Sequence, residues 1–238
     1  MITISQLTKS YDRKVVLAID GLTIGPGEIV GLIGNNGAGK TTLLRLMLDL
    51  VKADTGSALV CGHHVAGSEE WKPDTGAYLD ESFLIDYLTP DEFFDFVGRT
   101  RGMTRDDVRR TLDGFGPLFN GEIPGRGRSY IRDLSKGNMQ KVGIAAAMMG
   151  NPRVLLLDEP FAHLDPSSQI VFKRMLRDLQ RTTRPSILVS SHSLPHVVDL
   201  CSRVILLNKG KVVRDEQLGE NSERILHELE MYFSTLSQ

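Results

Sequence analysis

The sequence predicts an α/β fold: a mostly parallel sheet with an antiparallel β layer at the N-terminus and an inserted helical region. Short apolar runs alternate with longer amphipathic stretches, which is typical of parallel strands joined by helices. The first thirty residues instead contain short β-rich runs, and residues from about 89 to 133 contain no strand-like run. A length of 238 residues is enough for one sizeable core and a small inserted subdomain.

The strands are predicted from short apolar runs rich in β-branched residues. For the antiparallel layer these runs are residues 2–4, 15–17 and 22–24, with turns between them. For the parallel sheet they are residues 29–33, 154–157, 186–189 and 204–207. The parallel strands have no polar side, so both faces of their sheet are expected to be covered.

Helices are predicted where apolar residues recur with helical spacing, at residues 40–50, 91–101, 169–180 and 222–236. A further helix is expected after Thr104. The last stretch carries a single apolar stripe, which favours a helix docked on the core. That stripe consists of Ile225, Leu229, Tyr232, Phe233 and Leu236.

The helical insertion carries an aromatic cluster at Phe93, Phe94 and Phe96, beside Val97. Such a cluster at helical spacing favours packing over a functional role. The stretch 125–128 reads Gly-Arg-Gly-Arg and is predicted to be a solvated, flexible loop.

Composition indicates a soluble globular protein, with 41% hydrophobic and 24% charged residues. The net charge of -2 argues against nucleic acid as a main partner, since phosphate backbones select basic surfaces. Cys61 and Cys201 lie far apart, which favours small buried residues in a reducing compartment. Neither a secretion signal nor a run of about 18 apolar residues is present, so a membrane location would need a partner that spans the bilayer.

A glycine-rich loop between a predicted strand and a predicted helix fits G-x-x-x-x-G-K-[ST] from Gly34 to Thr41. Glycines let successive amides face phosphate groups, and the helix N-terminus adds a partial positive charge. Lys40 would pair with the β- and γ-phosphates, and the Thr41 hydroxyl would bind Mg²⁺. The loop predicts a P-loop NTPase core that binds ATP through Asn35, Gly37, Ala38, Gly39, Lys40, Thr41 and Thr42.

Two adjacent carboxylates, Asp158 and Glu159, follow the predicted strand 154–157. Ligands of open α/β sheets bind beyond the carboxyl ends of the strands. Alone, such a pair is as well explained by capping of the next helix. Beside a phosphate loop, Asp158 is expected to hold Mg²⁺ and Glu159 to polarise the attacking water.

Together with these motifs, the sequence resembles the ABC ATPase family. Residues 134–138 are similar to the family's signature motif, and residues 161–165 to its D-loop. His192 matches the switch histidine, and Tyr11 matches an aromatic residue that stacks on adenine, with Val16 beside it. The resemblance covers nearly the whole chain. It implies one ATPase domain over residues 1–238, with an ABC-type α-helical subdomain at about 89–136.

The resemblance also implies how such a domain works. Two ATPase domains, identical or different, face each other head to tail, and ATP bound at Lys40 of one is closed over by the signature motif of the other. The signature residues expected at the nucleotide are Ser135, Lys136, Gly137 and Asn138. His192 joins Glu159 as a catalytic residue, and hydrolysis drives a membrane permease on the inner face of the cell membrane.

The sequence departs from the family pattern at several positions. Lys136 and Asn138 replace the usual Gly and Gln of the signature, a variant similar to that of small stand-alone bacterial exporter ATPases. Lys136 either adds a cation near the nucleotide or points to solvent. The family's Q-loop glutamine is absent; Asp80 is its best match and a candidate Mg²⁺ ligand, with Glu81 second. His163 replaces a small residue in the D-loop, which favours a partly exposed interface position.

These features predict the ATP-binding subunit of an ABC transporter, a Mg²⁺-dependent ATPase. The alternative is a soluble ABC ATPase used in assembly, for example of iron–sulfur clusters. A DNA-linked ATPase would need long heptad arms or a basic face, and the sequence has neither. The permease is expected to insert a short helix between residues 82–87 and the helix near Asp91, over a floor of Phe83, Leu84, Ile85 and Phe94. The alternative is that these four side chains close the core of the helical subdomain itself.

Overall fold

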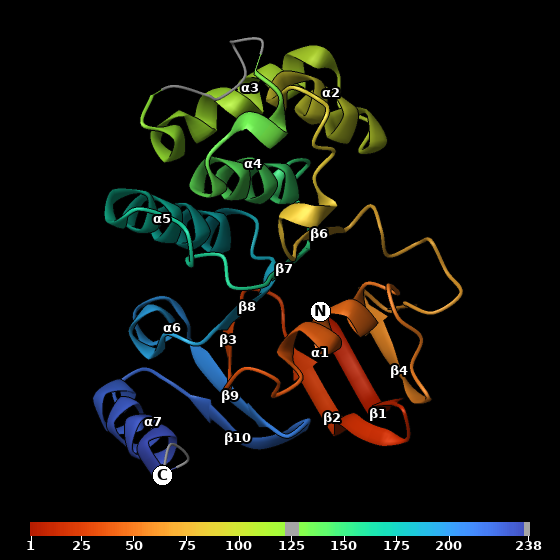
Figure 1. Cartoon of the computed structure of the whole chain (residues 1–238), viewed down its shortest axis with the longest axis vertical. Helices are drawn as coiled ribbons and strands as arrows, with labels where there is room; N and C mark the ends of the chain where they lie inside the picture. The colour runs from red at the N-terminus through yellow and green to blue at the C-terminus, as the bar shows by residue number, and fades with distance from the viewer. Residues whose placement is uncertain (122–128, 236–238) are drawn as a thin grey trace.

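A sheet with the strand order β10-β9-β3-β8-β7-β6 forms the centre of the computed structural model, which describes residues 1–121 and 129–235 (Figure 1). Its strands are β3 (Ile29–Ile33), β6 (Thr75–Tyr78), β7 (Val154–Leu157), β8 (Ser186–Ser191), β9 (Arg203–Asn208) and β10 (Lys211–Gln217). All neighbouring strands pair in parallel except β9 and β10, which are antiparallel. The prediction of a mostly parallel sheet is therefore confirmed.

The strands β3, β7 and β8 and the middle of β9 are buried on both faces, which explains why their apolar runs have no polar side. Successive residues point to opposite faces of a strand. Leu155 and Leu157 of β7 join the apolar cluster beneath the helices, whereas Val154 and Leu156 join the cluster formed with helix α1 (Lys40–Met47) and the N-terminal sheet. A helical layer therefore covers one face, and the N-terminal part of the chain covers the other.

The N-terminal sheet has the order β2-β1-β4-β5, with antiparallel pairing throughout. Its strands are β1 (Ile2–Tyr11), β2 (Lys14–Ile24), β4 (Thr55–Val60) and β5 (His63–His64). The prediction of separate short strands at 15–17 and 22–24 is wrong, because β2 runs through both. Asp20 and Gly21 interrupt the apolar pattern, but Gly21 still pairs with Ser5 of β1, so the ladder continues.

Helices α2 (Pro90–Thr100), α3 (Arg105–Phe115) and α4 (Lys136–Met148) lie at the end of the molecule remote from the N-terminal sheet (Figure 1). The short 3₁₀ helices η1 (Glu81–Phe83), η2 (Gly116–Phe119) and η3 (Ile131–Asp133) connect to them. Thr89 and Glu92 form a capping box that fixes the start of α2, as Thr104 and Asp107 do for α3. The predicted starts of both helices are correct to within one residue.

The aromatic cluster of α2 is divided between core and surface. Phe93 and Phe94 are buried, which confirms packing for these rings, while Phe96 is 49% exposed. The predicted loop at 125–128 lies outside the described residues. On α4, Gly143 leaves room for the ring of Tyr78, because a Cβ there would lie 2.4 Å from Tyr78 Cε2. Helix α4 therefore packs closely on β6.

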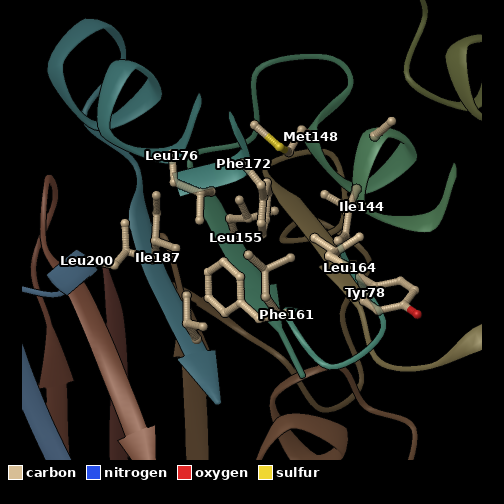
Figure 2. Packing of buried hydrophobic residues seen from close by; sticks show 14 of the residues in the cluster. Tyr78, Ile144, Met148, Leu155, Phe161, Leu164, Phe172, Leu176, Ile187 and Leu200 are labelled. Atoms are coloured by element: carbon tan, nitrogen blue, oxygen red, sulfur yellow. The ribbon is translucent and has the colours of Figure 1, made fainter. Parts of the chain in front are cut away.

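The remaining helices are α5 (Pro166–Thr182), α6 (Leu194–Leu200) and α7 (Ser222–Thr235). Figure 2 shows side chains of β7, α4 and α5 converging in the core, where the rings of Phe161 and Phe172 have centroids 5.4 Å apart. Ile225 and Leu229 of α7 are buried, which confirms the docked C-terminal helix; Leu236 lies outside the described residues. Within the described part of the chain, no helix combines the length and apolar character needed to cross a membrane.

Candidate functional site

The loop between β3 and α1 curls around the start of the helix. Gly39 has φ 108°, a conformation that favours glycine, and a Cβ there would lie 3.1 Å from the carbonyl oxygen of Val16. The Lys40 side chain is 7% exposed, and its Nζ donates to the carbonyl oxygen of Gly34 at 2.6 Å. The loop thus holds one ammonium group at the N-terminus of α1, where backbone amides also favour an anion.

The carboxyl ends of β3, β7 and β8 lie side by side because these strands are parallel neighbours. Asp158 follows β7 and is 6% exposed. Its Oδ2 accepts a hydrogen bond of 2.6 Å from Thr41 Oγ1, and its Oδ1 accepts one from Ser190 Oγ of β8. The order of the strands therefore brings residues 117 positions apart in sequence into direct contact.

The Glu159 carboxylate lies between two basic side chains. Its Oε1 is 3.7 Å from Lys40 Nζ, and its Oε2 is 2.8 Å from His192 Nδ1. The Glu159 backbone has φ 44°, an uncommon conformation for a residue with a side chain. This conformation directs the Glu159 carboxylate toward Lys40 of the phosphate loop and toward His192.

Lys40, Asp158 and Glu159 border an open pocket of about 330 Å³, whereas His192 reaches it only through its contact with Glu159. Among the predicted site residues, those that line it are Tyr11, Val16, Asn35, Gly37, Ala38, Gly39, Lys40, Thr41, Thr42, Asp158 and Glu159. Asn36 also lines it, although the sequence did not single that residue out for binding. Tyr11 ends β1 and is 44% exposed, so its ring is accessible at the rim.

The signature residues lie at the start of α4 and do not line this pocket. Ser135 is the N-cap, and its Oγ accepts a hydrogen bond of 3.3 Å from the Asn138 amide. Ser135 and Lys136 are exposed, whereas Gly137 lies against the D-loop, where a Cβ would be 2.8 Å from the His163 carbonyl oxygen. A single chain therefore presents the phosphate loop and the signature on separate surfaces.

Asp80 also lies outside this pocket. Its Oδ1 accepts a hydrogen bond of 2.8 Å from the Ser82 amide and so caps η1. It borders a neighbouring apolar groove of about 300 Å³. Burial, followed by the charges of Glu81, Asp80 and Asp158, raises the pKa of Tyr78 beside this groove.

The apolar groove lies where the sequence predicts the permease contact, but its floor differs. Phe83 and Leu84 line it, together with Phe93 and Val97 of α2. Phe94 is buried in the core and Ile85 packs against it, and neither lines the groove, so the prediction of these two residues as part of the floor is wrong. Residues adjacent on a helix point in different directions, and here Phe93 faces the groove.

Hydroxyl and carboxylate oxygens are the donors that Mg²⁺ prefers, and Thr41 and Asp158 bring one of each together. The described residues contain no cluster of three or more His, Cys, Asp or Glu able to hold a metal by themselves. This donor set therefore fits Mg²⁺ that is also bound by substrate phosphates, as Mg²⁺ commonly is.

Ser190 and Gln140 contact the site without having been predicted. Ser190 Oγ accepts from the Glu159 amide at 3.0 Å, and Gln140 Nε2 donates to the Glu159 carbonyl at 3.1 Å. Gln140 comes from α4 and Ser190 from β8. Only the predicted order of strands and helices could have indicated that these two side chains lie beside Glu159.

Comparisons with known proteins agree with this geometry. A family model described as ABC transporter matches residues 18–162. The chain is 36% identical, over 89% of its length and 76% of the relative's, to an uncharacterised ABC transporter ATP-binding protein of Methanocaldococcus jannaschii. It is 34% identical, over 90% of its length and 88% of the relative's, to the ABC transporter ATP-binding protein NatA of Bacillus subtilis.

Solved structures of ATP-binding proteins of this kind are also similar to the chain. An ATP-binding subunit of an ABC transporter aligns over 100% of both chains with a TM-score of 0.88 and 26% identity. An ATP-binding cassette solved as a dimer, in a post-hydrolysis state with ADP and Pi, aligns over 92% of this chain and 99% of its own with a TM-score of 0.81 and 25% identity.

Proposed function

The chain belongs to the ABC transporter family of ATP-binding proteins, and on that premise we propose that it hydrolyses ATP to drive transport through a separate membrane permease. The observation that carries this proposal is the convergence of Lys40, Thr41, Asp158 and Glu159 on one pocket. Each supplies a group that phosphoryl transfer to water requires.

The residues of the pocket have distinct tasks in this proposal. The loop amides and Lys40 bind the β- and γ-phosphates, and Tyr11 and Val16 receive the adenine at the rim. Thr41 and Asp158 would hold Mg²⁺, which neutralises phosphate charge when bound. Asp80 is the remaining proposed Mg²⁺ ligand, although its carboxylate caps η1 in this structure.

Glu159 orients the attacking water and takes its proton. The hydrogen bond from His192 to Oε2 and the charge of Lys40 near Oε1 fix the carboxylate in place. A general base raises the reaction rate by about 10²–10⁴-fold, so Glu159 supplies a large part of the proposed catalysis.

We propose that a second ATPase domain, of this chain or a related one, completes the site. Ser135, Lys136, Gly137 and Asn138 do not line the pocket of their own chain, but the exposed N-terminus of α4 is suited to bind a γ-phosphate presented by another chain. The solved relative described as a dimeric cassette supports a pairing of this kind.

The membrane partner is proposed to dock in the apolar groove bordered by Phe83, Leu84, Phe93 and Val97. Asp80 borders the same groove and lies just past β6, the neighbour of strand β7, which Asp158 follows. A permease helix seated there contacts the segment that follows β6, the strand paired with β7. This contact would place the chain on the inner face of the cell membrane.

The domain organisation is part of the same proposal: residues 1–238 form one ATPase domain, and about 89–136 form its helical subdomain. The assembly ATPase remains the second candidate function. The relatives reported above are named as transporter proteins, which favours transport.

The test is the Mg²⁺-dependent ATPase activity of the purified chain. Lys40→Ala removes the buried ammonium group, so we expect ATP binding to weaken and hydrolysis to fall close to background. Lys52→Ala removes an exposed lysine that does not line the pocket and should retain parental activity. Parental hydrolysis by Lys40→Ala would refute the proposed site.

A further inference from the structure

Gln140 is a buried polar side chain on α4 with partners in the loop that follows Asp158. It is 1% exposed, and its amide makes two hydrogen bonds outside its own helix. Nε2 donates to the Glu159 carbonyl oxygen at 3.1 Å, and Oε1 accepts from the His163 amide at 3.1 Å. A carbonyl only accepts and a backbone amide only donates, so these partners fix the orientation of the side-chain amide.

The bond from Gln140 Nε2, together with one of 3.2 Å from the Ala162 amide to the same carbonyl oxygen, helps to hold Glu159 in an uncommon backbone conformation. Its φ of 44° costs free energy that the surrounding structure must supply. Ser190 Oγ of β8 accepts a hydrogen bond of 3.0 Å from the Glu159 amide. Gln140 of α4 donates a hydrogen bond to the Glu159 carbonyl oxygen. The peptide groups on either side of the Glu159 Cα are thus each held by a buried side chain.

We propose that Gln140 is a positioning residue for ATP hydrolysis: it fixes the backbone of Glu159 and thereby aims the carboxylate at the attacking water. The inference rests on the proposed function, since Glu159 must be the general base. Gln140 contacts Glu159 but does not itself line the pocket, so it acts on the orientation of Glu159 and leaves nucleotide binding unchanged.

Gln140 also ties Glu159 to the signature segment, because it follows Ser135–Asn138 on the same helix. In the proposed dimer, that segment contacts the nucleotide of the other chain. A shift of α4 when its N-terminus closes on that nucleotide therefore moves the carbonyl of Glu159 through Gln140.

The experiment measures steady-state and single-turnover ATP hydrolysis by Gln140→Met, which keeps the length of the side chain but has no donor. We expect kcat to fall roughly 10- to 100-fold, as misorientation of a reacting group commonly does, with KM and the Kd for ATP within about twofold of the parent. Gln140→Asn keeps the amide but is one methylene shorter, so it cannot reach both the Glu159 carbonyl oxygen and the His163 amide. It should lose activity like Gln140→Met, and it carries the test if the Met variant does not fold.

Gln169→Met is the matched control. Gln169 Nε2 donates to the carbonyls of Phe161 and Leu164, so this variant loosens the same loop from α5 without touching Glu159. Its kcat should stay within about threefold of the parent, below the range expected for misorientation. An equal loss in the Gln169 and Gln140 variants would overturn the assignment, because loop packing would then explain both.

The Glu159→Gln background separates this inference from the function on which it rests. If Gln140 acts through Glu159, adding Gln140→Met to Glu159→Gln should not lower the single-turnover rate further. An additive loss, or a parental kcat in Gln140→Met, would contradict the positioning role. Undiminished hydrolysis by Glu159→Gln alone would instead refute the proposed catalytic base.

Discussion

Tyr11 presents the largest accessible aromatic surface of the pocket. It is the last residue of β1, and Lys9 Nζ lies 5.2 Å from its ring centroid. Tyr11 is 44% exposed, whereas the phosphate-binding Lys40, at the start of α1, is 7% exposed. This separation allows the base and the phosphates of one nucleotide to be held by different elements.

If Tyr11 stacks on adenine, Tyr11→Ala should weaken ATP and ADP equally, by roughly 1–3 kcal/mol on the scale of base stacking. Tyr11→Phe keeps the ring and should be nearly silent. Tyr130→Ala is the control, because Tyr130 is similarly exposed, at 42%, but does not line the pocket. Isothermal titration measures the affinities of the parent and the three variants for ATP and ADP. An equal loss in Tyr11→Ala and Tyr11→Phe would assign the role to the hydroxyl group.

At the scale of residues, the sequence predicts groups that are close along the chain and misses those brought together by the fold. Lys40 and Thr41 share one loop whose motif fixes their chemistry. Gln140 lies 19 residues before Glu159, and no local pattern marks it as a partner. Asp80 is the best match in the sequence to the family's Q-loop glutamine, but in the fold its carboxylate accepts a hydrogen bond from the Ser82 amide.

Among the elements, α5 begins at an N-cap, Asp165, that accepts several hydrogen bonds. Asp165 accepts from the hydroxyl groups of Ser167 and Ser168 and from the Ser168 amide, and Lys141 Nζ lies 3.2 Å away. The Ser167 hydroxyl, followed by that of Ser168, holds the pKa of Asp165 well below its usual range. The cap therefore links the D-loop, α5 and α4.

Asp165→Ala should lower the free energy of unfolding by about 1 kcal/mol at neutral pH, the usual cost of losing an N-cap. Because the folded-state pKa is lowered, this stabilisation is present above the unfolded-state pKa of about 3.9 and is lost as pH falls toward the folded-state value. Urea unfolding should therefore show a difference from the parent that narrows below about pH 4. Asp178→Ala, on the exposed side of α5, should show little difference at either pH.

The groove between η1 and α2 allows a matched test of the membrane contact. Phe83 and Phe96 are both 49% exposed, but only Phe83 lines the groove. Apolar anchors dominate helix-in-groove contacts, so Phe83→Asp should break co-sedimentation with permease-containing membranes while ATP affinity stays parental. Phe96→Asp should sediment as the parent does. Retention of folded Phe83→Asp on those membranes would place the contact elsewhere.

Elements were predicted well where burial produces a pattern and poorly where it does not. The buried apolar runs within β3, β7, β8 and β9 predict these strands correctly, because both of their faces are covered. Strand β10 was missed, since its side chains alternate between exposed and half-buried at the edge of the sheet. Strands β4 and β6 contain glycines and were missed for lack of a continuous apolar run.

For the whole molecule, the main consequence of the fold is that a chain carries two half-sites. The phosphate loop, Asp158 and Glu159 face one pocket, while Ser135–Asn138 lie at the start of α4 outside it. The D-loop connects them, since His163 contacts both Gln140 and Gly137. Hydrolysis in this account requires two chains, and each contributes half of every site.

The most direct test is the solution mass of Glu159→Gln with ATP and Mg²⁺, measured by light scattering during gel filtration. This variant binds ATP but lacks the base, so the closed pair should accumulate at twice the 26.4 kDa mass of the chain. With ADP, or with Ser135→Arg added to block the signature surface, the mass should return to that of one chain. A single-chain mass with ATP demonstrably bound would contradict the shared site.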